Sequence, residues 1–181
     1  MSTEQPGLFD EPEATPAERA APSKVINPPQ AFLPGVNYEQ SYPQISSLQE
    51  LRSLALKCRN CRLRDGCQQV VFGEGNPCAR LLFIGEGPGK DEDEAGLPFV
   101  GRAGQLLDKI LIAAELKRSE VYIANVVKCR PPGNRLPNPD EVKQCRNYLE
   151  AQIRLINPQI IVCLGSLASQ VVIDPAVRIT K

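Results

Sequence analysis

The sequence predicts an α/β fold in which helices cover a mainly parallel β-sheet. Three short apolar runs, each bounded by turn residues, are typical of buried strands: residues 80–84, 121–127 and 159–164. Segments whose apolar residues recur at helical spacing lie between these runs. Because parallel strands are joined by helical crossovers, the alternation of strand and helix along the chain favours one such sheet.

The predicted helices have their own sequence signals. Residues 46–57 repeat Leu and Ala at helical spacing, with Ser47 as N-cap and Glu50 as its capping-box partner. Residues 104–116 repeat apolar side chains in the same way. Residues 138–156 begin with Asn and Pro, which suit the N-cap and the first helical position. These segments supply the helices of the α/β fold.

The first part of the chain has a different composition from the rest. Within residues 1–50 seven acidic side chains accompany only two basic ones, and eight of the 17 prolines lie there. Such a segment buries too little apolar surface to offset the entropy lost on ordering. We therefore expect residues 1–45 to form a disordered tail and residues 46–181 to form one domain. The excess of basic side chains in that domain permits a nucleic-acid partner.

The composition excludes several kinds of site. Because none of the 181 residues is His, Ser–His and Cys–His nucleophile pairs, imidazole acids or bases and Cys₂His₂ zinc sites are excluded. No apolar run approaches the roughly 18 residues of a membrane span, and residues 1–10 lack the basic region of a secretory signal. We therefore expect a cytoplasmic protein without membrane contact, in which the cysteines are metal ligands or core residues rather than disulfides.

Four cysteines are candidates for a metal site. They form two pairs on either side of a βα unit, and an x₂ spacing lets two thiolates bind one metal from a single turn. A second pair would complete a four-thiolate site, which suits either zinc or an iron–sulfur cluster. Spacing alone does not choose the metal, and it leaves Cys67 and Cys78 as alternative partners within the predicted loop 58–78. The four candidates are Cys58, Cys61, Cys129 and Cys145.

A glycine-rich turn follows the first predicted strand. It spans residues 85–89, at the end of a strand where open α/β sheets bind ligands. Lys90 stands where the Rossmann pattern needs Gly, and Ile84 stands where the phosphate loop needs Gly, so both nucleotide motifs fail. What remains is a turn whose bare backbone lets a ligand approach closely. The acidic run 91–94 would repel phosphate and is expected to be a solvated loop.

Longer stretches identify a family. They are FGEGNP (72–77), GEGPGKDEDEAGLPFVGRAGQLLD (85–108), NVVKCRPPGNRLPNPDEVKQC (125–145) and IIVCLG (160–165). In this order they resemble the family 4 uracil-DNA glycosylases, which carry an iron–sulfur cluster, and the resemblance covers residues 51–181. It implies a three-layer α/β/α fold with a central mainly parallel sheet. It also implies a base-excision repair enzyme, a hydrolase of the N-glycosidic bond of uracil in DNA that leaves an abasic site.

The resemblance also implies the cofactor and its ligands. In that family four cysteines hold a [4Fe–4S] cluster, which is thought to be structural. The matching positions are Cys58, Cys61, Cys129 and Cys145. The resemblance therefore leaves Cys67, Cys78 and Cys163 as non-ligands, and Cys163, inside a predicted strand, is expected to pack in the core.

The same resemblance implies a pocket for a flipped uracil, built from Gly85, Glu86, Gly87, Phe99 and Asn125. Phe99 would stack on the base, and the amide of Asn125 would pair with uracil O4 and N3–H while mispairing with cytosine. Backbone N–H groups of the glycine turn would stabilise the leaving uracilate. We assign Glu86 the catalytic role, to position the attacking water or to stabilise oxocarbenium charge.

Further partners are expected from the sequence. Uracil-containing DNA is the implied substrate, and six basic residues are candidate phosphate contacts: Arg59, Arg62, Arg64, Lys128, Arg130 and Arg135. Gln5, Leu8 and Phe9 resemble the Q-x-x-L-F peptides by which bacterial repair proteins bind the replication sliding clamp. The chain is expected to be a monomer.

The sequence departs from the family at its end. Family members continue into later strands and a His-Pro motif whose His lies at the glycosidic bond, whereas this chain has no His and ends near a possible further short strand. We therefore expect an incomplete domain that lacks its C-terminal strands, either a fragment or a natural truncation. The alternative function is a catalytically impaired iron–sulfur DNA-binding remnant. A third, weaker candidate function is that of a related glycosylase that acts on another damaged base.

Overall fold

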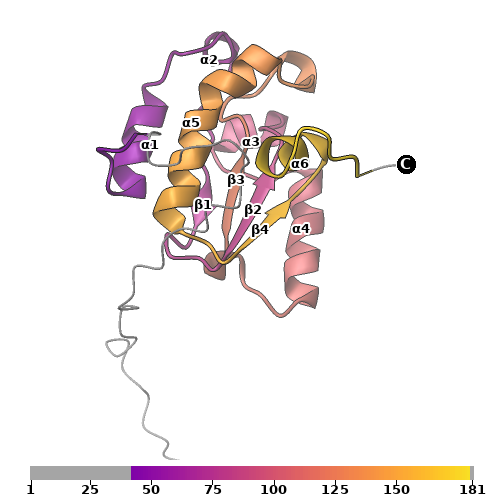
Figure 1. Ribbon diagram of the computed structural model, residues 1–181. Helices are drawn as coiled ribbons and strands as arrows, with labels where there is room; N and C mark the ends of the chain where they lie inside the picture. Colours follow the sequence, from indigo (N-terminus) through magenta and orange to yellow (C-terminus); the bar gives the residue numbers. More distant parts are fainter. Residues whose placement is uncertain (1–41, 180–181) are drawn as a thin grey trace, which may run out of the picture.

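The computed structural model describes residues 42–179, and its sheet has four strands in the order β1-β3-β2-β4 (Figure 1). Strand β2 (Leu81–Gly85) is central and pairs in parallel with β3 (Tyr122–Asn125) and with β4 (Ile160–Cys163). Strand β1 (Glu74–Gly75) pairs antiparallel with β3. The predicted α/β fold with a mainly parallel sheet is confirmed, and all three predicted strands are present.

Helices lie on both faces of this sheet, which gives three layers (Figure 1). Helices α1, α5 and α6 contribute to the core on one face, and α4 contributes to the core on the other. Two 3₁₀ turns, Arg118–Glu120 and Pro132–Asn134, lie in the connections. The helices are α1 (Leu48–Leu56), α2 (Leu63–Gly66), α3 (Lys90–Ala95), α4 (Arg102–Ala113), α5 (Pro139–Ile156) and α6 (Ser166–Val172).

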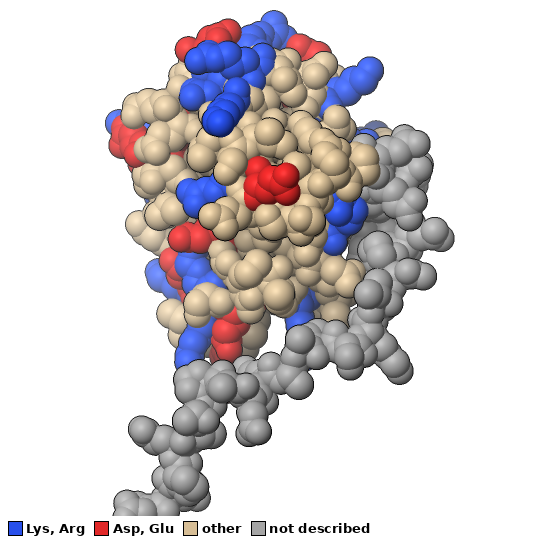
Figure 2. All heavy atoms as spheres, turned by 90° about the vertical axis from the view of Figure 1, so that its left-hand side faces the viewer, with Lys and Arg blue, Asp and Glu red and all other residues tan. Residues whose placement is uncertain are grey.

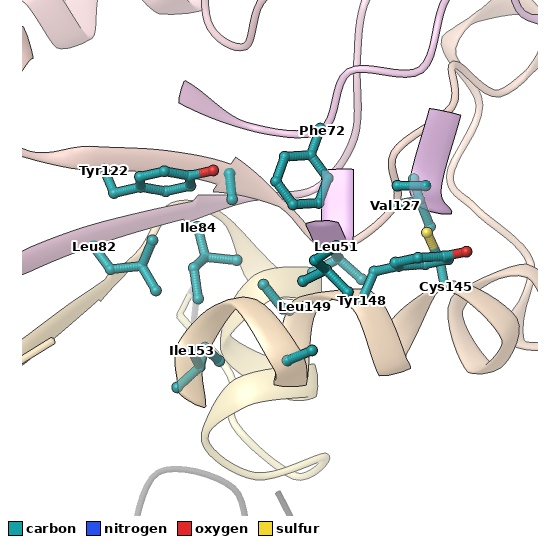
Figure 3. Close-up of a cluster of buried hydrophobic side chains, with 14 of the residues drawn as sticks. Leu51, Phe72, Leu82, Ile84, Tyr122, Val127, Cys145, Tyr148, Leu149 and Ile153 are labelled. Atoms are coloured by element: carbon teal, nitrogen blue, oxygen red, sulfur yellow. The ribbon is translucent and has the colours of Figure 1, made fainter. Parts of the chain in front are cut away.

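Alternation along the strands separates the two cores. Leu82 and Ile84 of β2 point toward α1 and α5, whereas Phe83 between them packs on the side of α4. Figure 3 shows the larger core, with Cys145 at one end of it, close to Val127. The cysteine of α5 therefore lies where the apolar core meets the loops that follow the strands.

Two predicted helix starts are confirmed in detail. The N-cap Ser47 accepts a hydrogen bond from the backbone N–H of Glu50 at 3.2 Å, although the Glu50 carboxylate accepts from Ser46 rather than from Ser47. Helix α5 begins at Pro139 after Asn138, whose backbone N–H donates to the Glu141 carboxylate at 2.7 Å. Local capping chemistry therefore sets where these helices begin.

Three local predictions were wrong. The predicted loop 58–78 contains the single turn α2 and the short strand β1. The acidic run 91–94 is helical, because Glu92 caps α3 through Gly89 and acidic side chains suit the first turn of a helix. The segment expected to be a further strand is helix α6 (Ser166–Val172), so β4 is an edge strand of the described sheet.

The described part begins at Tyr42. Its ring packs against Tyr148 with centroids 5.1 Å apart, and the Arg154 guanidinium donates to the backbone carbonyls of Tyr42 and Ile45. The predicted tail lies outside the described residues except for its last four, as does the predicted clamp motif Gln5, Leu8 and Phe9. Within residues 42–179 no helix combines the length and the hydropathy that crossing a membrane requires.

Candidate functional site

An open cleft lies at the carboxyl ends of β2 and β3. Glu86, Gly87, Phe99 and Asn125 line it together, although they come from three separate segments of the chain. Gly85 lies against two of them, because a Cβ built on it would be 2.5 Å from Asn125 Oδ1 and 2.6 Å from the Phe99 ring. The structure therefore brings all five predicted uracil-binding residues to one place.

Asn125 has an unpaired acceptor at this cleft. It is the last residue of β3, and only 1% of its surface is exposed. Its Oδ1 is one of two buried side-chain polar atoms in the described part of the chain without a hydrogen-bond partner. A buried acceptor left unpaired costs about 1–3 kcal/mol. Asn125 Oδ1 is therefore free to accept a hydrogen bond from outside the described residues.

Phe99 is held in a backbone conformation that a bulky residue rarely adopts, with φ of 53°. The Glu92 carboxylate fixes the chain after it by accepting from the N–H groups of Val100 at 2.9 Å and Gly101 at 2.8 Å. Gly104 allows close approach, since a Cβ there would collide with the Phe99 carbonyl. The ring is therefore positioned by its neighbours and not by local preference.

Glu86 is the half-buried carboxyl group of the glycine turn. Its backbone carbonyl accepts from Val127 N–H at 3.1 Å, and the Gly85 carbonyl accepts from Val126 N–H at 2.8 Å, so the turn is held to the residues that follow β3. Burial raises the pKa of the Glu86 carboxyl above its ordinary value of 4.5. A carboxyl group with a raised pKa in a cleft is suited to proton transfer.

Sequence reasoning missed two residues of the cleft. Glu92, assigned to a solvated loop, accepts from three backbone N–H groups around the cleft and so holds the glycine turn to the Phe99 segment. Its position three residues after Gly89 is the available signal, because that is capping-box spacing. Asn134 also lines the cleft, with φ of 55° and with Oδ1 accepting from Arg130 Nε at 2.7 Å. Its place in a Pro-Pro-Gly-Asn turn indicates only a turn.

The four candidate cysteines line one small cavity. Burial raises the pKa of Cys61, Cys129 and Cys145, in the last case to about 11, and the neighbouring thiols contribute to each shift. Within residues 42–179, however, no three His, Cys, Asp or Glu side chains stand close enough together to hold a metal ion. The thiols thus converge on one apolar space without forming a closed coordination site.

The other cysteines separate into two kinds. The Cys67 thiol contacts that of Cys129 and accepts from Arg64 Nη1 at 3.5 Å, so it lies beside the cavity. Cys78 is exposed, and Cys163 lies in β4. Cys78 is therefore not a partner of the first pair, whereas Cys67 is within reach of the same cavity.

A buried carboxylate ties together the segments around this cavity. The Glu141 side chain is fully buried and accepts from both Nη atoms of Arg135 at 2.8 Å and from Arg62 Nε at 2.9 Å. The Arg135 guanidinium, with help from the Asn138 N–H and Arg62, lowers the pKa of Glu141 to about 2. Arg62 follows Cys61 directly, so this ion-pair group connects the first cysteine pair to the start of α5.

The predicted phosphate contacts are not equivalent. Lys128 is buried, with 2% of its surface exposed, and burial lowers its pKa to about 8, so the expectation that it contacts DNA was wrong. Arg62 and Arg135 are bound to Glu141. Figure 2 shows Lys and Arg gathered at the upper end of the face where Figure 1 places α2. Arg59, which precedes α2, is exposed.

Comparison with known proteins places these features in a family. The family model of the Uracil DNA glycosylase superfamily matches residues 72–179. The Type-4 uracil-DNA glycosylase of Thermotoga maritima is 52% identical over 126 residues, which are 69% of this chain and 66% of that protein. The corresponding protein of Archaeoglobus fulgidus is 46% identical over 130 residues, which are 72% of this chain and 65% of that protein.

A third relative, the Type-4 uracil-DNA glycosylase of Sulfurisphaera tokodaii, is 46% identical over 122 residues, 67% of this chain and 56% of its own length. The chain thus spans between about half and two-thirds of the length of these curated relatives. The match includes the glycine turn, Phe99, Asn125 and the second cysteine pair. The chain therefore belongs to the uracil DNA glycosylase superfamily.

Proposed function

We propose that the chain acts in DNA base-excision repair as a uracil-DNA glycosylase of the type-4 class, hydrolysing the bond between uracil and deoxyribose. The relatives carry that name, and the cleft is lined by Glu86, Gly87, Phe99 and Asn125, four of the five residues predicted to bind uracil. The observation that carries the proposal is the buried, unpaired Oδ1 of Asn125 beside the Phe99 ring. Uracil inside a duplex is unreachable, so the base has to be flipped into this cleft.

Recognition of uracil is assigned to Asn125 and Phe99. Uracil offers an N3–H donor to Asn125 Oδ1 and an O4 acceptor to the amide N–H, whereas cytosine offers the opposite pattern on both atoms. A site with buried polar groups rejects the wrong base strongly, because those groups would remain unpaired. Phe99 supplies the stacking surface, and Gly85, which has no Cβ, allows the Asn125 amide and the Phe99 ring to lie close against it.

Hydrolysis is assigned to the glycine turn and to Glu86. Water attacks C1′ of the sugar as the bond from C1′ to N1 breaks, and the bonding electron pair leaves on the base as uracilate. Backbone N–H groups of the turn stabilise the charge that develops on the base. The Glu86 carboxylate positions the water and accepts its proton, or stabilises the positive charge on the sugar. The raised pKa of Glu86 suits that proton transfer.

The four-cysteine cavity is assigned to an iron–sulfur cluster. Four thiols around one apolar cavity match the ligand chemistry of [4Fe–4S], although within residues 42–179 no three of these side chains stand close enough together to hold a metal ion. Cys58, Cys61, Cys129 and Cys145 would hold the cluster, which when bound supplies a cross-link between the loop before α2, the end of β3 and α5. Cys67 remains outside this ligand set.

The partners follow from the same proposal. Uracil-containing DNA is the substrate, with Arg59, Arg64 and Arg130 as phosphate contacts. We also propose that the chain is a monomeric cytoplasmic protein and that Gln5, Leu8 and Phe9 bind the replication sliding clamp. Calorimetry with a peptide of residues 1–15 and the purified clamp tests the last point, and no measurable heat of binding would remove it.

The deciding experiment is uracil release from a uracil-containing single-stranded oligonucleotide by anaerobically purified protein, detected by alkaline cleavage of the abasic product. We expect release by the wild type and loss of release by Asn125→Ala, with Asn147→Ala on the exposed side of α5 as the matched control. If soluble protein with its cluster binds the oligonucleotide but releases no uracil, the alternative of a catalytically impaired DNA-binding chain holds instead.

A further inference from the structure

Lys128 is a charged side chain buried between the cleft and the cysteine cavity. Only 2% of its surface is exposed, and it lies three residues after Asn125 and directly before Cys129. Burial of an ammonium group is costly unless the surroundings compensate its charge. A side chain kept in such a place therefore requires a specific explanation.

The Lys128 ammonium group contacts the cleft residue Asn125 at its backbone carbonyl. Nζ donates to the backbone carbonyl of Asn125 at 2.7 Å and to Gln152 Oε1 at 2.5 Å. Gln152 is itself fully buried and donates through Nε2 to the Phe72 carbonyl at 2.8 Å, so its orientation is fixed. The ammonium group thereby ties the residue that would recognise uracil to the middle of α5.

Among the described residues no carboxylate pairs with this charge. The acceptors around Nζ are a carbonyl and an amide, both neutral, and none of the ion pairs of residues 42–179 includes Lys128. On its other side Lys128 lines the cavity of the four cysteines, and its backbone N–H donates to Cys145 Sγ at 3.3 Å. The one titratable side chain of the described residues whose charge acts on the Lys128 ammonium group is that of Cys145.

We propose that Lys128 is a positioning residue that links the two sites: its ammonium group compensates the negative charge of a thiolate-bound cluster and holds the Asn125 carbonyl in place. This inference rests on the proposed function. A cluster on four thiolates is net negative, and its potential depends on nearby charge and on hydrogen bonds to sulfur. The uracil cleft and the cysteine cavity both act on Lys128. Binding at either site should therefore change the affinity of the other site.

The test removes the charge and keeps the volume. Lys128→Met, with Lys109→Met on the exposed side of α4 as control, is purified anaerobically with its cluster. We expect a more negative midpoint potential for Lys128→Met in protein-film voltammetry, because adding an electron is harder without the nearby positive charge. We also expect kcat/KM for uracil release to fall by about 10²-fold, the cost of a 1 Å misplacement at the reacting site.

A second variant separates positioning from general damage. Gln152→Glu keeps an acceptor for Nζ but places a carboxylate beside it, so it should lower the potential and largely retain uracil release. This variant decides the question if Lys128→Met does not fold.

The inference is overturned if the wild type contains a cluster and releases uracil while both Lys128→Met and Gln152→Glu match the Lys109→Met control. The proposed function fails in a different way, since the wild type would then release no uracil. A wild type without iron and sulfide overturns the cluster half of the inference together with the cofactor assignment.

Discussion

Gly85 allows the sharpest test of the recognition site. A Cβ on this residue would lie 2.5 Å from Asn125 Oδ1 and 2.6 Å from Cε2 and Cζ of Phe99. Non-bonded heavy atoms prefer separations of about 3.5–4.0 Å, so each group would have to retreat by about 1 Å. Gly85→Ala therefore displaces the amide and the ring together without removing either.

The expected effect falls on activity more than on stability. A displacement of 1 Å at a reacting site can cost about 10²-fold in rate, which corresponds to about 2.7 kcal/mol at 1.36 kcal/mol per tenfold. Overpacking a core costs about 1–3 kcal/mol. We expect the lower end of that range here, because Asn125 and Phe99 border an open cleft into which they can move.

The assay compares single-turnover uracil release and urea unfolding for the wild type, Gly85→Ala and Gly66→Ala. Gly66 is the matched control, since a Cβ built on it has no atom within 4 Å. If Gly85→Ala folds and releases uracil within about twofold of the wild type, a ratio worth only about 0.4 kcal/mol, Asn125 and Phe99 do not form the recognition site.

Three other predictions follow from the site. Glu141→Gln should lower the free energy of unfolding, measured in urea, by about 1–3 kcal/mol. The exposed Glu74→Gln variant is the control, and equal stability of the two variants would contradict the role of Glu141 in holding Arg62 and Arg135. Because the pKa of Glu141 is lowered to about 2, its stabilisation should be present above pH 4.5 and be lost as pH falls toward 2, a loss absent from Glu141→Gln. Glu86→Gln should slow the single-turnover rate of uracil release more than it weakens DNA binding. The raised pKa of Glu86 places the acidic limb of the wild-type pH profile above pH 4.5, and this limb should disappear in Glu86→Gln. An unchanged rate would remove the catalytic assignment of Glu86. Cys145→Ser should lose iron, sulfide and the visible absorbance of the cluster, whereas Cys78→Ser should retain them; the same iron content in both would contradict the ligand set.

Local sequence signals predicted most of the secondary structure. The apolar runs that became β2, β3 and β4, and the capped helices α1 and α5, depend on neighbours a few residues apart, so periodicity and capping rules apply to them directly. Helix α3 was missed because its six residues are mostly acidic and carry no apolar period. Glu92 caps this helix through Gly89, and its carboxylate also accepts from the backbone N–H groups of Val100 and Gly101.

By itself, the sequence determined the α/β class, the two cysteine pairs and the glycine turn at a strand end, because each is a pattern of neighbouring residues. Only the tertiary structure decided which basic side chains are available to DNA. Arg62 pairs with Glu141, 79 residues away, while 60% of its side chain stays exposed, whereas Lys128 reaches Gln152 across the core and is buried. Contacts between residues so distant in the chain depend on how helices and strands pack, which local patterns do not encode.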